Sequence, residues 1–296
     1  MTGTVFDIGY QSYSGPREGR DRSQLAVYKD GVRAALGLGR PIRAKAMPWL
    51  FIAVLSFIAL VMALIAGAVD RMMGARVAEQ LPSHSDFYGI ASIIVFVFAA
   101  VVGPELLCRD RREGTISLYL VRPLTGSEYV LSRWVAFMTV MTAVLWFPQF
   151  ILFVGLCLGD PRPVEYLRWH WLDIPRFLGA GLAMAAYATS LALLTASFTT
   201  RRAYASVFLV GLFVILTPFT VGLASQIDGP VGQWISMFNL SNIPVHVNDV
   251  IFNHVSEITE DAPARELGST ILVSWYFAWT FAAAGLLWWR YRRLAP

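Results

Sequence analysis

The sequence predicts an all-α polytopic membrane protein with six transmembrane helices. Hydrophobic residues make up 56% of the 296-residue chain, charged residues make up only 15%, and the mean hydropathy is +0.54. Soluble domains carry about 25% charged residues. A helix needs roughly 20 mainly apolar residues to cross a hydrocarbon core of about 30 Å, and six windows meet that length. The predicted spans are residues 47–69, 88–107, 133–157, 175–198, 204–225 and 270–289.

These spans predict two parts, a cytoplasmic N-terminal segment at 1–46 and a single six-span transmembrane domain at 47–296. The first 46 residues are polar and glycine-rich, and the first apolar run is long enough to span, so no cleavable signal peptide is expected. The stretch Leu25–Arg43 predicts an amphipathic helix at the inner membrane interface. The alternative is a basic tail that only fixes orientation. The apolar face of the helix comprises Val27, Val32, Ala35 and Leu36.

The distribution of basic residues predicts that both termini lie in the cytoplasm. An even number of spans puts the termini on one side, and this orientation places 18 of the 24 Lys and Arg residues inside. Cytoplasmic loops carry the excess of basic residues in membrane proteins. The excess of basic residues is therefore explained by membrane topology and by contact with lipid headgroups, and no nucleic-acid partner is expected. Arginine far outnumbers lysine, which favours a GC-rich bacterial genome. The expected location is therefore a bacterial cytoplasmic (inner) membrane.

Ionisable residues are nearly absent from the predicted spans. Glu105 lies at the inner end of the second span, and Asp173 and Arg176 lie at the outer end of the fourth. Proton-coupled transporters and intramembrane enzymes keep titratable groups at mid-depth, so both classes are disfavoured. Pro148 and Pro218 lie within spans and are candidate hinges, although membrane helices also accept proline as an ordinary kink.

No catalytic or nucleotide-binding motif is present. The chain lacks G-x-x-x-x-G-K-[ST], and neither of its two lysines, Lys29 and Lys45, follows a glycine. It also lacks the G-x-S-x-G elbow and the zinc-hydrolase helix. We therefore expect that this chain alone is not an enzyme and that it binds no cofactor or metal. His246 and His254 could be read as a metal pair, but neither a cysteine nor an HExxH motif accompanies them.

The predicted outer loop between the fifth and sixth spans contains two apolar stretches, Gly232–Leu240 and Val245–Phe252. Neither is long enough to span, so both are expected to form short or re-entrant helices. The two cysteines, Cys108 and Cys157, fall near opposite membrane faces, and a disulfide between them is therefore not expected.

A charged elbow separates the second and third spans. From Arg109 to Glu113 the chain reads Arg-Asp-Arg-Arg-Glu. Gly114 is expected to break the preceding helix, because glycine readily adopts backbone angles that end one. Thr115 is then expected to cap a new helix with its hydroxyl group.

The new helix is expected to be short and to lie along the inner membrane surface. Its apolar residues Ile116, Tyr119 and Leu120 would share one face. Pro123 would end the element, because the residue before a proline disfavours helical angles. A rigid element that joins two spans and is exposed to the cytoplasm can transmit a push.

At these residues the sequence resembles the membrane subunits of ABC-2 type transporters, the permease class of type V ABC exporters. That family carries Glu-Gly-Thr followed by leucines, then a proline and a small polar residue before the next span. The six spans, the amphipathic lead-in and the apolar outer loop are also similar, so the likeness covers most of the chain. The chain departs from the family at Thr125-Gly126, where Ser-Arg is common. The matching residues are Glu113, Gly114, Thr115, Leu118, Leu120, Pro123, Leu124, Thr125, Tyr129, Leu131 and Arg133.

The resemblance implies that the Glu113–Pro123 element is a coupling helix that docks on a separate ABC ATP-binding subunit. Two permease chains, expected to be a homodimer, and two ATPase subunits carrying ATP and Mg would form the complex in the bilayer. The implied function is ATP-driven movement of a substrate across the cytoplasmic membrane, with export favoured. The alternative is a non-transporting scaffold that relays ATP-driven change to envelope machinery. The implied interface residues are Arg109, Arg111, Arg112, Glu113, Gly114, Thr115, Leu118, Tyr119, Leu120 and Pro123.

Overall fold

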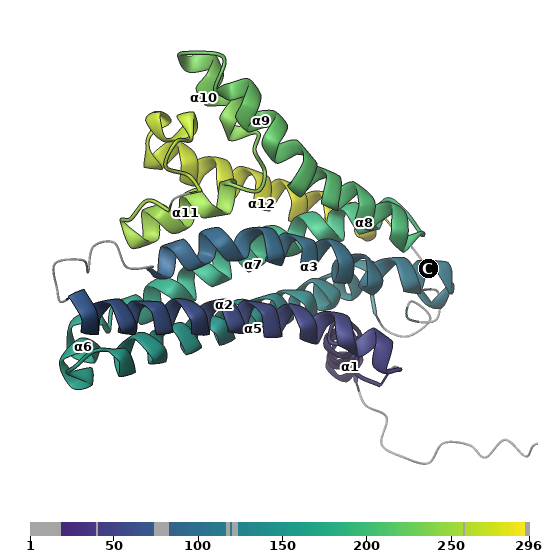
Figure 1. Cartoon of the computed structure of the whole chain (residues 1–296). Coiled ribbons are helices and arrows are strands. Elements are labelled where there is room, and N and C mark those ends of the chain that lie inside the picture. Colours follow the sequence, from purple (N-terminus) through teal and green to yellow (C-terminus); the bar gives the residue numbers. More distant parts are fainter. Residues whose placement is uncertain are drawn as a thin grey trace, which may run out of the picture.

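Six long helices form the bundle, as the sequence predicts (Figure 1). The computed structural model describes residues 19–39, 41–73, 83–116, 119, 124–256 and 258–293, and every regular element in these ranges is a helix. The helices long and apolar enough to cross a membrane are α2 (Ile42–Met73), α3 (His84–Arg112), α5 (Gly126–Gly159), α7 (Asp173–Ser197), the continuous rod α8 (Arg202–Val210), η2 (Gly211–Ile215) and α9 (Leu216–Ala224), and α12 (Ser269–Arg292).

Helices α3 and α5 begin earlier than the apolar windows at 88 and 133, because each starts with a capping box. Ser83 accepts a hydrogen bond from the backbone N–H of Asp86, whose side chain binds the backbone N–H of Ser83. Thr125 and Glu128 make the same pair of contacts at the start of α5. Each box satisfies two of the backbone donors that a helix start leaves unpaired.

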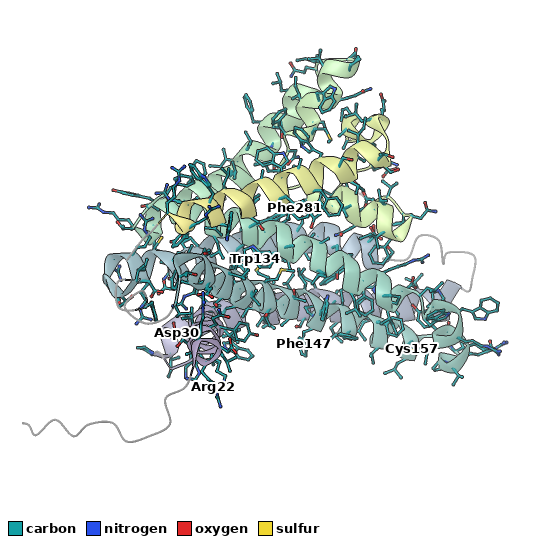
Figure 2. All side chains as sticks on the ribbon, turned by 180° about the vertical axis from the view of Figure 1, so that it is seen from behind. Arg22, Asp30, Trp134, Phe147, Cys157 and Phe281 are labelled. Carbon is teal, nitrogen blue, oxygen red and sulfur yellow. The ribbon has the colours of Figure 1, made fainter. Side chains whose placement is uncertain are left out.

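The burial of the spans separates a centre from a periphery. In α3 and α7, 67% of the apolar window is buried within the protein, against 28% in α2, 22% in the α8–α9 rod and 28% in α12. Large apolar side chains such as Phe147 and Phe281 point outward from the bundle (Figure 2). An apolar outer surface is what lipid tails require of a spanning helix, so α3 and α7 form the core, α5 is half-buried at 50%, and α2, the α8–α9 rod and α12 form the periphery.

Helices α2 and α5 run side by side along a seam of small residues (Figure 1). A Cβ added at Gly155 would lie 2.5 Å from the Cβ of Ala63, and one added at Gly159 would lie 3.1 Å from the Cα of Gly67. Small residues four apart on both helices let the two backbones approach closely. Among the described elements this is the pair with the most extensive contact.

The two candidate hinge prolines have different surroundings. Pro148 lies inside α5, which continues without a break to Gly159. Pro218 lies in the first turn of α9, directly after the π-helical turn η2. A proline removes one backbone donor and displaces the preceding turn, and a widened π turn accommodates that change. The irregularity of the fifth span is therefore local to Pro218, and whether either site acts as a hinge remains a prediction.

Short helices cover both ends of the bundle. Helix α1 (Arg20–Ala35) crosses one end, together with the α3–α5 connection and the last turn of α12; we call this the basic end (Figure 1). Helix α6 (Pro163–His170) lies at the opposite end. The stretch between the fifth and sixth spans forms α10 (Pro230–Met237), α11 (Ile243–Phe252) and the turn η3 (Pro263–Leu267), which confirms the expected short helices.

The predicted separation of the two cysteines is confirmed. Cys108 is buried near the basic end of α3, and Cys157 lies at the other end of the bundle, far from Asp30 in α1 (Figure 2). Both thiols are unoxidised.

Candidate functional site

The elbow begins where α3 ends. The helix runs through Arg112, and the backbone N–H of Glu113 still donates to the carbonyl of Arg109 at 2.9 Å. Gly114 then adopts a φ of 69°, a left-handed angle that favours glycine. The predicted helix break at Gly114 is confirmed. Thr115 uses its hydroxyl differently from the expectation, since it donates to the carbonyl of Asp110 at 3.3 Å and so closes the end of α3.

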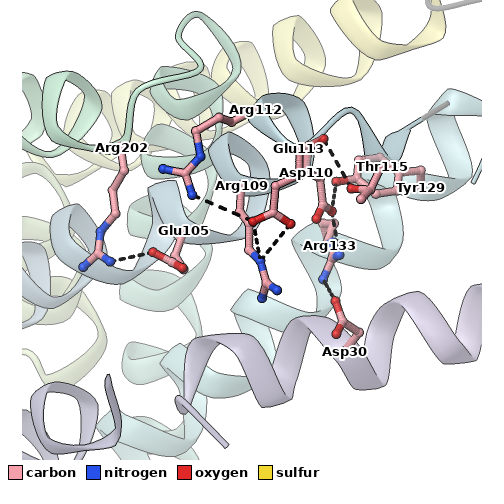
Figure 3. A network of polar contacts seen from close by, with 10 residues as sticks. All are labelled: Asp30, Glu105, Arg109, Asp110, Arg112, Glu113, Thr115, Tyr129, Arg133 and Arg202. Carbon is pink, nitrogen blue, oxygen red and sulfur yellow. Dashed lines mark hydrogen bonds and ion pairs between the residues drawn. The ribbon is translucent and has the colours of Figure 1, made fainter. Parts of the chain in front are cut away.

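Three charged side chains of the elbow face outward. Arg109 Nε lies 3.3 Å from Glu113 Oε1, and Arg112 lies 3.8 Å from the same oxygen (Figure 3). The exposed fractions of these side chains are 43% for Arg109, 66% for Arg112 and 43% for Glu113. Exposed ion pairs of this kind contribute at most about 1 kcal/mol, so these groups are readily available to another molecule.

The neighbouring charge, Asp110, faces inward and belongs to a buried ionic cluster. Arg133 of α5 is only 1% exposed and lies 2.6 Å from Asp110 and 2.8 Å from Asp30 of α1 (Figure 3). The Tyr129 hydroxyl also donates to Asp110, at 2.6 Å. Arg133 and Asp110 are buried, whereas Asp30 is 56% exposed and pairs with Arg133 from the rim. Buried charges persist when they are paired and hydrogen-bonded, so this ionic cluster of Asp30, Asp110, Tyr129 and Arg133 joins three helices at one point.

Close packing of α1 on α5 brings Asp30 to the cluster. Val27, Gly31 and Ala35 recur every four residues and are the buried face of α1. A Cβ at Gly31 would lie 2.7 Å from the Cβ of Ala136 and 3.4 Å from the Arg133 guanidinium, so only glycine allows this approach. A helix is thus present where the amphipathic one was predicted, but it spans Arg20–Ala35 and ends before the predicted limit at Arg43. Its buried face packs against α5 of its own chain.

The elbow is also tied to the fourth and sixth spans. Arg111 donates to the carbonyl of Ser197, the last residue of α7, and to that of Thr199 just beyond it. Arg290 of α12 donates to the same Ser197 carbonyl at 3.0 Å. Helix ends leave carbonyls unpaired and carry partial negative charge, so arginine is well suited to these positions. A further ion pair at 2.6 Å joins Glu105 of α3 to Arg202 of α8.

The apolar face after the elbow turns toward the bundle. Ile116 and Tyr119 are partly buried and pack against the core, and the Tyr119 ring lies 5.6 Å from that of Tyr129. Burial, with the nearby Asp110 carboxylate as a second cause, raises the pKa of the Tyr119 hydroxyl. Tyr119 therefore anchors the elbow on the bundle. The predicted interface residues Leu118, Leu120 and Pro123 lie outside the described residues.

The structure thus divides the predicted interface residues into two groups. Arg109, Arg112, Glu113 and Gly114 are exposed at the turn, whereas Arg111, Thr115 and Tyr119 hold the turn in place.

Sequence reasoning missed Asp30 and Asp110 as part of this site. The window 88–107 ended before Asp110, and nothing local to Asp110 distinguishes it from the exposed charges beside it. One signal was present: Tyr129 and Arg133 are four apart, hence on one helix face, at the start of an apolar span. A charge on the core-facing side of a span calls for a buried partner.

Metal ligation has no support in the described part of the chain, where no group of three His, Cys, Asp or Glu side chains could hold an ion.

The sequence profile of a family described as ABC-2 family transporter protein matches residues 10–289. The chain belongs to this ABC-2 family. Comparison with curated proteins gives no significant match. As an ABC-2 permease, the protein is a membrane component of an ABC transporter, and its family partners an ATP-binding subunit. The six apolar helices agree with a multi-pass permease.

Proposed function

We propose that this permease couples ATP hydrolysis by a separate ATP-binding subunit to export of a substrate across a bacterial inner membrane. In this proposal the basic end lies in the cytoplasm, and the exposed face of the elbow, formed by Arg109, Arg112 and Glu113, docks on the ATPase. The observation that carries the proposal is the buried ionic cluster behind that face. It makes the exposed turn one rigid unit with α1, α3 and α5.

The contacts behind the elbow give a route for force. A displacement of the turn pulls on Asp110, and through Arg133 it moves α5 and α1 together. Arg111 extends the same connection to the end of α7, where Arg290 of α12 also binds. A ligand shifts a conformational equilibrium only by its difference in affinity for the two states. In this proposal the ATPase pair holds ATP and Mg. ATP would shift the equilibrium because it binds more tightly to the closed ATPase pair.

The working complex we propose contains two permease chains, as a homodimer, and two ATPase subunits. The apolar character of the spans favours a lipid-like or amphiphilic cargo over a small ion. Measured flux of a cargo in reconstituted vesicles would distinguish a transporter from a scaffold that turns over ATP without moving a substrate.

The docking face can be tested with Arg112→Glu. Arg112 is 66% exposed and outside the buried cluster, so charge reversal should leave thermal stability unchanged. It should lower recovery of the ATP-binding subunit in a pull-down of the co-expressed complex by about tenfold or more, because rim charges steer and orient such encounters.

The matched control is Arg162→Glu at the opposite end of the bundle. Arg162 is 72% exposed and pairs with Glu165 at 3.0 Å, much as Arg112 pairs with Glu113. It should leave ATPase recovery intact. Tyr119→Asp is a second comparison, and it should lower both stability and recovery, because Tyr119 packs inward. Full recovery of the ATPase with Arg112→Glu would contradict the docking face.

A further inference from the structure

A groove of about 410 Å³ lies where α5, α7 and α12 meet, and it runs along α12 toward the basic end. Its volume falls within the range of about 300–1,000 Å³ that small-ligand sites occupy. Trp134 of α5 and Phe281 of α12, both labelled in Figure 2, belong to its wall. Two of the wall side chains, Leu131 and Phe281, are 57% and 68% exposed, so the groove opens sideways toward the hydrocarbon of the membrane.

The polar side chains within the groove already have partners in the bundle. Trp134 Nε1 donates to Ser190 Oγ at 3.1 Å, and the Tyr276 hydroxyl donates to the Ala183 carbonyl at 2.9 Å. Thr280 Oγ1 donates to the Tyr276 carbonyl, also at 2.9 Å. A polar molecule that entered would lose its hydrogen bonds to water without replacing them, at a cost in free energy. The groove therefore suits an apolar occupant.

The length of the groove corresponds to one membrane leaflet. Its wall on α12 extends from Tyr276 to Trp288, which is about 18 Å at a rise of about 1.5 Å per residue. One leaflet contributes half of a hydrocarbon core of about 30 Å. Trp288 is 45% exposed at the basic end of the groove, and amphipathic indole rings prefer the headgroup level. The groove thus extends from headgroup level toward mid-membrane, as a phospholipid acyl chain does.

Two exposed arginines follow the basic end of the groove. The guanidinium of Arg292 lies 5.3 Å from the centre of the Trp288 ring, and that of Arg293 lies 3.7 Å from the centre of the Trp289 ring. Neither arginine forms an ion pair with a residue in the described ranges. A guanidinium that stacks on an aromatic ring keeps the N–H donors at its edge. Arg292 is therefore placed to bind an anion at headgroup level.

The neighbouring charges leave this end of the groove positive. Glu128 precedes Val130, a wall residue of α5, but its carboxylate is paired with Arg20 of α1 at 2.5 Å. Arg292 and Arg293 thus keep their positive charges. Basic residues at a membrane surface attract anionic lipids, so the headgroup favoured here is anionic.

We propose that this groove is a binding site for an anionic phospholipid of the leaflet at the basic end. One acyl chain lies in the groove along α12, and the phosphate accepts hydrogen bonds from Arg292. A zwitterionic phospholipid brings its own positive charge toward the same arginines and binds more weakly. The bound lipid contacts α5, α7 and α12 together. The proposal does not depend on ATPase docking or on transport.

The test uses the full chain in a non-ionic detergent, titrated with phospholipid and analysed by native mass spectrometry. Phosphatidylglycerol and phosphatidylcholine with the same long acyl chains are the probes. Phosphatidylglycerol should bind about fivefold more tightly or better, because a basic residue at the headgroup favours an anionic lipid to that extent. Phosphatidylglycerol with short acyl chains should bind weakly, because it cannot fill the groove.

Four variants separate the headgroup from the acyl chain. Arg292→Gln, at an exposed position, should weaken phosphatidylglycerol binding about fivefold and leave phosphatidylcholine binding unchanged. Arg201→Gln is its matched control, since Arg201 stacks over Tyr204 at 5.5 Å but is not part of the groove. Ala284→Trp fills the groove and should weaken binding of both lipids by about tenfold or more. Ala53→Trp, on the exposed face of α2, should change neither.

Equal binding of the two long-chain lipids overturns the proposal, as does an Arg292→Gln protein that keeps its preference for phosphatidylglycerol. Unchanged lipid binding in a folded Ala284→Trp protein places the lipid elsewhere and also overturns it. If Ala284→Trp abolishes a dimer of the chain and leaves lipid binding intact, the groove is a contact between two copies and the proposal is wrong.

Discussion

The two ends of this bundle bury polar groups in opposite ways. At the basic end, the buried Arg133 pairs with the buried Asp110 and with Asp30, which is 56% exposed, so that the ion pairs connect three helices. At the opposite end, the His84 and His246 rings are buried, and His84 Nε2 and both ring nitrogens of His246 have no hydrogen-bond partner among the described residues. Paired buried charges fix one geometry, because any displacement exposes an uncompensated charge.

Unpartnered neutral groups have a different consequence. They raise the free energy of the observed state. A ligand or a rearrangement that supplies a hydrogen-bond partner lowers that free energy. The basic end is therefore built to transmit movement as one unit. The opposite end keeps buried polar atoms that a rearrangement could supply with partners. The four predictions below test that contrast.

The largest effect is expected from Arg133→Met. This change leaves Asp110 buried without its cation, and breaking a buried ion pair costs about 3–5 kcal/mol. The measurement is reversible unfolding of the purified protein in mixed micelles. The double variant Asp110→Asn with Arg133→Met should recover a substantial part of the loss. Arg112→Met, at an exposed position in the same elbow, should change stability by less than about 0.5 kcal/mol. Equal losses from Arg133→Met and Arg112→Met would contradict the buried cluster.

The second effect is an acid sensitivity centred on His246 in α11, a helix too short to span. Burial, with repulsion from Arg265 as a lesser cause, lowers the pKa of His246 to about 4, from 6.5. Between these values the unfolded chain binds a proton that the folded chain refuses, so stability falls as pH falls. The loss at pH 5 should be roughly 2 kcal/mol relative to pH 7.

Hydrogen exchange of α11 at several pH values measures this effect, and His246→Phe should flatten the profile. Burial raises the pKa of the neighbouring Asp249 carboxyl, and that group contributes in the opposite direction, since the folded state takes up its proton first. A profile that stays steep in His246→Phe would assign the acid sensitivity to another group.

A third prediction concerns the α2–α5 seam, which joins both ends. Gly155→Ala places a methyl group 2.5 Å from the Cβ of Ala63, so the helices must separate, at a cost of about 1–2 kcal/mol. Gly179→Ala is the matched control, because a Cβ there meets nothing within 4 Å. Thermal melting of both variants gives the comparison. A stable Gly155→Ala protein would show that the seam is looser than its geometry indicates.

The smallest effects should come from the two capping boxes, one at each end. Ser83→Ala at the start of α3 and Thr125→Ala at the start of α5 should each cost about 1 kcal/mol. The two costs are measured by chemical denaturation. Similar values would show that both capping boxes stabilise their helices equally, so that the two ends differ in their buried side chains. A cost several times larger at one end would shift the contrast to the helix starts.

Much of the fold could be predicted from local pattern. The length and apolarity of each window fixed the six spans, since every spanning helix must satisfy its own backbone. Glycine at position 114 predicted the break in the elbow, and the observed left-handed angle agrees. The helix boundaries were less accurate at α3 and α5, because capping boxes extend both helices into polar sequence.

The sequence alone determined six spans and a charged turn between the second and third, because hydropathy and chain-breaking residues act over a few neighbours. Only the tertiary structure decided that Asp110 meets Arg133, 23 residues away, and that Arg133 also reaches Asp30. It likewise decided that Tyr119 faces the bundle and that His84 buries one ring nitrogen without a partner among the described residues. Such pairings depend on how closely and at what rotation helices pack, and no local pattern contains that geometry.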